Sequence, residues 1–388
     1  MTLLPSSVRM HEAKVPMMRD QNGFSLLEML IAIVIMGIIM AMNGQLLQEL
    51  IRGQRQQAAI ATNQYETSLG LELLRSDVSS AGFGLADEFK SAPGTYTEAT
   101  SDPAQQFNSA PSVPRALSHN NNVGAFTNYL PNSDYLVIRS PAVGMNTAAG
   151  KWTNITGTTV HIWNDVNLDM VNGQDYMIVV KPRSALGGRA QLIVSSGAYA
   201  LQYVTSALDP AFQPSSGTGE RYLAFGVDDT TPPVRPFNRA DYYVKRPSTA
   251  NPGCAPGTGT LYKYVVPHAA SAVPAEDNEW PLIECVANMQ VVFRLDTNLD
   301  GIPEDPPVND ISGLDALSIK EQVKEVRIYI LGHEGMMDRS FRYGGANPLT
   351  VGPTTALGTS VDLTGFGADW NHYRWKIYTL VIKPRSFY

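Results

Sequence analysis

The sequence predicts an α+β protein in which one long N-terminal helix packs on a domain rich in antiparallel β-strands. No proline interrupts residues 24–81, so a single helix can run through them. Segments rich in β-branched and aromatic residues, bounded by Gly or Pro, then recur from residue 135 to the C-terminus. Some of these segments alternate apolar and polar residues, as strands with one solvated face do.

The composition is that of a folded, acidic protein. The chain has 388 residues, a net charge of −7 and 44% hydrophobic residues, which excludes a disordered chain. Its acidic balance argues against nucleic-acid binding, which needs a basic surface. Enzyme signatures are missing, since His333-Glu334 lacks the second histidine of a zinc protease and no Gly-x-Ser-x-Gly elbow occurs. We therefore expect no enzymatic activity.

The N-terminal junction carries the most specific functional pattern. Gly23 precedes Phe-Ser-Leu-Leu-Glu, and an otherwise uncharged apolar run continues to Met42, about the length that spans a bilayer. Glu28 lies inside this run, where an ionisable side chain is costly and therefore indicates a function. A secretory signal peptide would instead place its small-residue cleavage site after the apolar core. A plain membrane anchor gives no reason for Glu28.

These residues resemble the class III signal of type IV pilins and type II secretion pseudopilins. The resemblance implies that residues 1–23 are a leader, with Met17 or Met18 as alternative starts. It also implies that a prepilin peptidase cuts between Gly23 and Phe24 and that Phe24 is then N-methylated. Glu28 would neutralise the Phe24 amine during assembly, because a paired buried charge is tolerated where a single one is expensive.

Beyond Met42 the helical pattern becomes amphipathic. We expect helix over the region 24–84, with residues 24–42 in the membrane or filament core and Gly82-Phe83-Gly84 as a stop. The uninterrupted part gives a helix of about 58 residues, about 87 Å long. Three glycines weaken it: Gly37, Gly44 and Gly53. The resemblance implies local melting there in a filament, whereas a lone helical glycine more often marks close packing.

Residues 85–388 are expected to form one β-rich globular domain, with a loop insertion at about 87–130 where Ser, Thr, Ala, Asn and Pro are abundant. The expected strands cover residues 135–138, 158–163, 176–180, 192–194, 242–244, 261–266, 289–295, 326–331 and 373–382.

The order of these parts is similar to that of PilW-type minor pilins, although the later matches are looser than the leader. The similar segments are residues 81–84, 133–139, 261–263, 281–293 and 323–331, followed by a basic-aromatic C-terminal strand. This resemblance implies a pilin fold with a periplasmic head.

Cys254 and Cys285 are the two cysteines of the chain. In an exported, oxidising compartment an even count favours a disulfide, which would close a loop of about 31 residues and contribute roughly 3–4 kcal/mol. Two unrelated buried thiols are the alternative, and the spacing is not that of a metal site.

One loop has the residue types of a cation site. Asp296, Asn298 and Asp300 precede Gly301, and oxygens at such spacing can wrap Ca²⁺. Pro307 stands where an EF-hand has its bidentate glutamate, so Glu304, Asp305 or Asp310 would have to substitute. An ordinary Asp/Asn/Gly surface turn is the alternative.

Taken together, the sequence predicts a minor pilin that initiates or caps a type IV pilus. It would be a single-pass inner-membrane protein with a periplasmic C-terminal domain, and would lie at the cell surface after assembly. The expected partners are prepilin peptidase, other minor pilins, the major pilin, the inner-membrane assembly platform and a tip adhesin, with no nucleic acid. The alternatives are a minor pseudopilin of type II secretion, or a membrane-anchored periplasmic or adhesive module that uses calcium.

Overall fold

The computed structural model describes residues 25–91, 96–124, 126–183, 188–205, 208–215, 219–269, 272–275 and 277–385. Residues 1–23 and Phe24, with the expected cleavage site, lie outside the described residues. The chain divides between Arg55 and Gln56 into two units, here named the N-terminal unit and the head.

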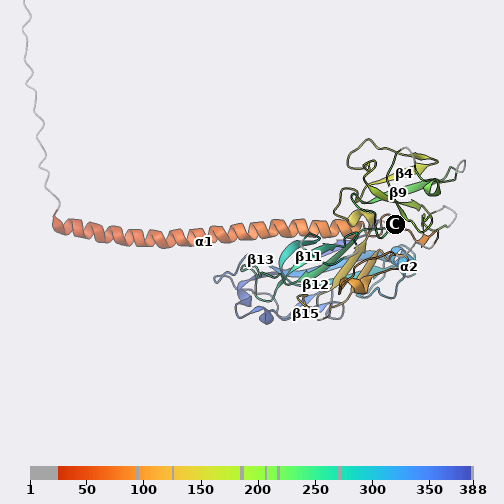
Figure 1. Ribbon diagram of the computed structural model, residues 1–388. Helices are drawn as coiled ribbons and strands as arrows, with labels where there is room; N and C mark the ends of the chain where they lie inside the picture. The colour runs from red at the N-terminus through yellow and green to blue at the C-terminus, as the bar shows by residue number, and fades with distance from the viewer. Residues whose placement is uncertain are drawn as a thin grey trace, which may run out of the picture. The chain divides into compact units, whose positions relative to one another are not determined.

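Helix α1 (Leu26–Ser79) contributes to both units (Figure 1). It starts with the pattern of a capping box, because Glu28 Oε2 accepts the Ser25 N–H at 3.0 Å and Ser25 Oγ accepts the Leu27 N–H at 3.4 Å. It ends two residues before the expected Ala81. The expected stop follows it, where Gly82 and Gly84 adopt φ values of 74° and 72° that favour glycine.

The described residues of the head form two seven-stranded sheets. The larger is antiparallel throughout, in the order β16-β13-β12-β11-β10-β3-β2. Its strands are β2 (Leu117–Asn120), β3 (Tyr135–Arg139), β10 (Arg239–Lys245), β11 (Gly259–Val265), β12 (Glu279–Leu295), β13 (Val323–Glu334) and β16 (Arg374–Ile382). Figure 1 labels β11, β12 and β13 of this sheet.

The smaller sheet has the order β1-β7-β6-β9-β4-β5, with β8 paired to β6, and only its β1–β7 pair is parallel among the described strands. Its strands are β1 (Glu88–Phe89), β4 (Trp152–Thr156), β5 (Thr159–Val160), β6 (Tyr176–Lys181), β7 (Gln191–Leu192), β8 (Ala200–Gln202) and β9 (Arg221–Asp228). A hairpin of β14 (Leu349–Val351) and β15 (Thr359–Val361) and a short helix α2 (Ala316–Gln322) complete these elements. Among the described residues, short 3₁₀ helices lie at Ala104–Phe107, Pro141–Val143, Pro210–Phe212, Leu363–Phe366 and Trp370–His372.

One hydrophobic core joins the head. Leu74 and Val78 of α1 belong to the same buried cluster as Ile328 of the larger sheet and Phe225 of the smaller sheet. The end of α1 is therefore a structural part of the head, and the predicted α+β class is confirmed.

Some strands differ from the sequence-based expectation. The expected strand at 158–163 is limited to β5, while β4 and β9 were not expected. Strands disfavour glycine, yet β9 carries Gly226. Glycine is required at this position because an added Cβ would collide with the Ala148 carbonyl oxygen. The segment expected as a loop insertion, 87–130, contains β1, a 3₁₀ helix and β2, and β2 forms an edge of the larger sheet.

Candidate functional site

The N-terminal unit presents an apolar helix surface whose described residues are exposed. Leu26, Ile33 and Met42 are 83%, 68% and 67% exposed. Helix α1 is long and apolar enough to cross a membrane, and its most apolar window has a mean hydropathy of 2.3 with no buried residue. An apolar surface of this size marks contact with lipid or protein.

Glu28 is the charged residue of this surface. Its carboxylate is exposed and bends back toward the start of the helix, where it accepts the Ser25 N–H. Within a single chain this contact caps the helix, which is the structural role available without a partner. Because Ser25 immediately follows Phe24, the contact also shows that the carboxylate reaches to within one residue of the expected new N-terminus.

The end of α1 is held to the head by a buried ion pair that the sequence analysis missed. Asp77 Oδ2 lies 2.7 Å from Lys263 Nζ and accepts the Tyr242 hydroxyl at 2.7 Å. Burial raises the pKa of Asp77, against the opposing effects of Lys263 and Tyr242. The sequence did offer a signal, because Asp77 is an acidic residue within the apolar stripe of Leu74 and Val78. A carboxylate that is buried with such a stripe requires a buried partner.

A second buried network joins an irregular segment to the larger sheet. Glu98 Oε2 lies 2.8 Å from Arg139 Nε and 3.0 Å from Arg239 Nη1, and Arg239 also pairs with Asp241 at 2.7 Å. Burial raises the pKa of Glu98, but the two guanidinium groups outweigh burial and lower that pKa to about 2. Glu98 thus remains ionised and fixes its segment in the head.

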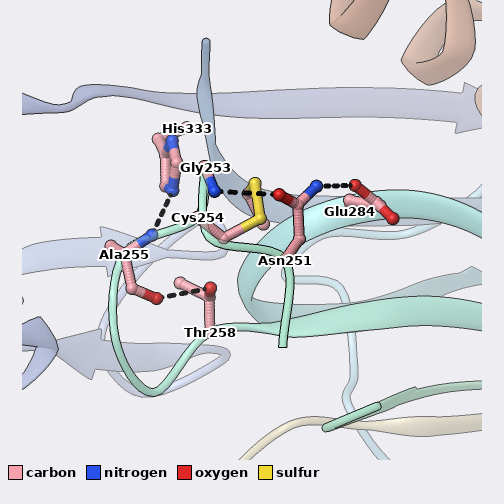
Figure 2. The surroundings of a disulfide bond; sticks show 8 residues. Asn251, Gly253, Cys254, Ala255, Thr258, Glu284 and His333 are labelled. Atoms are coloured by element: carbon pink, nitrogen blue, oxygen red, sulfur yellow. Dashed lines mark hydrogen bonds between the residues drawn. A yellow bond between two sulfur atoms is a disulfide. The ribbon is translucent and has the colours of Figure 1, made fainter. Parts of the chain in front are cut away.

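The structure joins Cys254 and Cys285 by a disulfide, with Cα atoms 5.0 Å apart (Figure 2). Cys254 lies in the connection between β10 and β11, and Cys285 lies in β12. His333 of β13 lies beside them, and its Nε2 accepts the Ala255 N–H at 2.8 Å (Figure 2). The disulfide therefore ties an irregular loop to the centre of the larger sheet.

The structure brings the three expected calcium ligands onto one turn after β12. Asp296 is buried, and its two carboxylate oxygens accept the N–H groups of Asp300 and Gly301 at 3.0 and 2.9 Å. Asn298 Oδ1 also accepts the Asp300 N–H, and Lys324 Nζ lies 3.7 Å from Asp296 Oδ2. These contacts form a self-contained polar turn, so calcium binding stays a prediction.

A comparison with models of known protein families gives a match at the N-terminal junction of the chain.

Residues 18–42 match the prokaryotic N-terminal methylation motif.

This motif is the class III signal peptide of pilin-type proteins. It supports a type IV pilin-like or pseudopilin-like protein, and implies processing by a prepilin peptidase and assembly with other pilins. Such proteins are structural, and the apolar helix is compatible with a membrane-anchored pilin that has a C-terminal globular domain. No curated protein and no solved structure matches the chain.

Proposed function

We propose that the protein is a minor pilin that helps to initiate or cap a type IV pilus. The observation that carries this proposal is the methylation motif at residues 18–42, which contains Gly23, Phe24 and Glu28. Cleavage after Gly23 and methylation of Phe24 would leave the apolar part of α1 in the inner membrane, with the head in the periplasm. Assembly would then transfer that part from lipid into a bundle of similar helices.

Glu28 acts in this proposal as the group that selects the docking position. Its carboxylate accepts a backbone N–H near the helix start in the single chain. In a filament the same carboxylate would pair with the Phe24 amine of a neighbouring subunit. Both charges would be costly in apolar surroundings alone, so the pairing favours one axial position of the helix.

The head supports a place at the filament end. It comprises residues 56–388, with two large sheets on one core. A head of this size would crowd a regular shaft, whereas an end position leaves room for it. The order of segments similar to PilW-type minor pilins agrees with this place, and the partners would be other minor pilins, the major pilin, the assembly platform and a tip adhesin.

A minor pseudopilin of type II secretion is the second candidate, because the methylation motif is shared by both classes. Filaments sheared from cells that make the protein should contain it, beginning at methylated Phe24, as mass spectrometry of the N-terminal peptide would show. Its deletion should abolish surface filaments and leave protein secretion intact. Loss of secretion with normal filaments would favour the pseudopilin, and loss of neither would reject both.

A further inference from the structure

Strand β16 forms an open edge of the larger sheet. It is nine residues long and pairs with β13 on one side, and among the described residues no strand pairs with its other side. The side chains of Lys376, Thr379 and Val381 along it are exposed. An edge of this kind carries N–H and C=O groups that are free to pair with another chain. Strand β16 therefore offers a row of main-chain hydrogen bonds to an extended partner.

A cavity of about 530 Å³ lies at the end of this edge, beside α1. Arg385, the third residue after the end of β16 at Ile382, lines the cavity together with Arg75 and Phe83. Arg75 is exposed and lies 3.4 Å from Glu72, which also lines the cavity. Peptides that add to a sheet edge gain affinity from main-chain hydrogen bonds and specificity from pockets for their side chains. The open edge and the cavity together supply both features.

The edge is basic. Residues 374–385 contain four basic side chains and no acidic one, although the chain as a whole is acidic. Arg374 and Lys376 already pair with acidic side chains of the head, at 2.7 and 2.8 Å. Lys383 and Arg385 are exposed, and the described residues give them no ion-pair partner. Two positive charges at the end of the edge thus remain available to a partner.

We propose that β16 receives an extended acidic segment of a partner protein as an additional strand, with one apolar side chain of that segment in the cavity. Acidic side chains of the segment would meet Lys383 and Arg385, and such complementarity selects the partner. A second copy of this chain is disfavoured, because it would set one basic β16 against another. The contact uses the head alone, so it goes beyond the docking of α1 through Glu28.

The test uses the full chain in detergent micelles and a fluorescent peptide of about nine residues, the length of β16. In this acidic peptide valine and threonine alternate with glutamate, and a phenylalanine stands at each end. Its fluorescence anisotropy should rise on binding, and hydrogen exchange of the β16 amides should become slower. The same peptide with lysine in place of glutamate should bind at least about tenfold more weakly.

Charge variants separate this contact from general attraction to the protein. Lys383→Glu combined with Arg385→Glu reverses the two available charges and should weaken the acidic peptide at least about tenfold. Arg189→Glu combined with Arg221→Glu makes the same change of net charge at exposed positions of the smaller-sheet region, and should leave its affinity unchanged.

A second pair of variants tests the cavity. Ser76 lines it from an exposed position of α1, so Ser76→Trp should fill it and weaken the acidic peptide several-fold. Ser68→Trp, at an exposed position of the same helix outside the cavity, should bind like the parent. The proposal is overturned if the acidic peptide does not bind, if the lysine peptide binds equally, or if β16 exchange is unchanged. Self-association that slows β16 exchange without peptide would assign the edge to a second copy and also overturn it.

Discussion

The two stretches of α1 share one secondary structure but differ in what covers them. From Leu26 to Ile51, every large apolar side chain given by the structure is at least 40% exposed. From Gln56 to Ser79, by contrast, the helix buries Thr67, Leu74, Asp77 and Val78 within the head. The apolar face of the second stretch is thus covered by other residues of the head. The described part of the first stretch presents an exposed apolar surface, which is typical of contact with lipid or with other proteins.

The largest expected loss of stability comes from breaking the buried network that joins Glu98 to Arg139 and Arg239 in the head. Glu98→Gln would remove the carboxylate that contacts the buried Arg139, while the buried Arg239 would keep its contact with Asp241. Removal of one partner from a buried ion pair costs about 3–5 kcal/mol. Urea unfolding of the full chain in detergent, followed by tryptophan fluorescence, should show this loss.

Glu66→Gln is the control for that experiment, because Glu66 is exposed on α1. Its unfolding free energy should stay close to that of the parent. Equal stability of Glu98→Gln and the parent would show that the head does not depend on this network.

Acidification should weaken the head through His333. Its folded-state pKa of about 4 lies below the ordinary value of 6.5, so between these values the unfolded chain binds a proton that the folded chain does not. Stability should therefore fall as pH falls from 6.5 to 4, by up to about 3 kcal/mol. In His333→Gln this part of the pH dependence should vanish, while His161→Gln, which alters an exposed histidine, retains it. An unchanged pH profile in His333→Gln would contradict the assignment.

Replacement of glycine by alanine should have opposite effects on stability in the two stretches of α1. A Cβ at Gly70 would lie 2.8 Å from the Leu282 carbonyl oxygen, so Gly70→Ala should cost about 1–3 kcal/mol of head stability. A Cβ at Gly53 meets no atom within 4 Å, so Gly53→Ala should stabilise the local helix by about 1 kcal/mol. Thermal unfolding of the head and hydrogen exchange around residue 53 would measure these effects. The same sign at both positions would erase the contrast between the stretches.

The smallest effect is expected at the turn after β12. If Asp296, Asn298 and Asp300 bind calcium, adding calcium chloride should raise the thermal midpoint of the head by a few degrees. Asp300→Asn should reduce this increase, whereas magnesium chloride should not reproduce it. A calorimetric titration without heat and an unchanged midpoint would end the calcium prediction.

The sequence was most informative where local chemistry decides the structure. The missing prolines and the Gly82-Phe83-Gly84 stop predict α1, and the spacing of Gly23, Phe24 and Glu28 predicts the junction that matches the methylation motif. Alternating strands such as β13 and β16 were predicted for the same reason.

Features that depend on distant contacts were not predictable in this way. Gly226 weakens the strand signal of β9, and its small size is explained only by the nearby carbonyl oxygen of Ala148, which is distant in the sequence. Lys263 follows a strand pattern, yet its buried partner Asp77 lies in a helix 186 positions earlier, the difference between the two residue numbers. His333 similarly approaches the cysteines only through the pairing of β12 with β13.

We propose that the exposed first stretch of α1 docks into an assembly through Glu28. In cells that make the protein at its natural level, Glu28→Ala should be cleaved after Gly23 in normal amounts and remain in the membrane. It should be missing from sheared filaments, as measured by quantitative mass spectrometry of head peptides against the major subunit. Glu66→Ala should be incorporated like the parent. Incorporation of Glu28→Ala at the parental ratio would contradict the account.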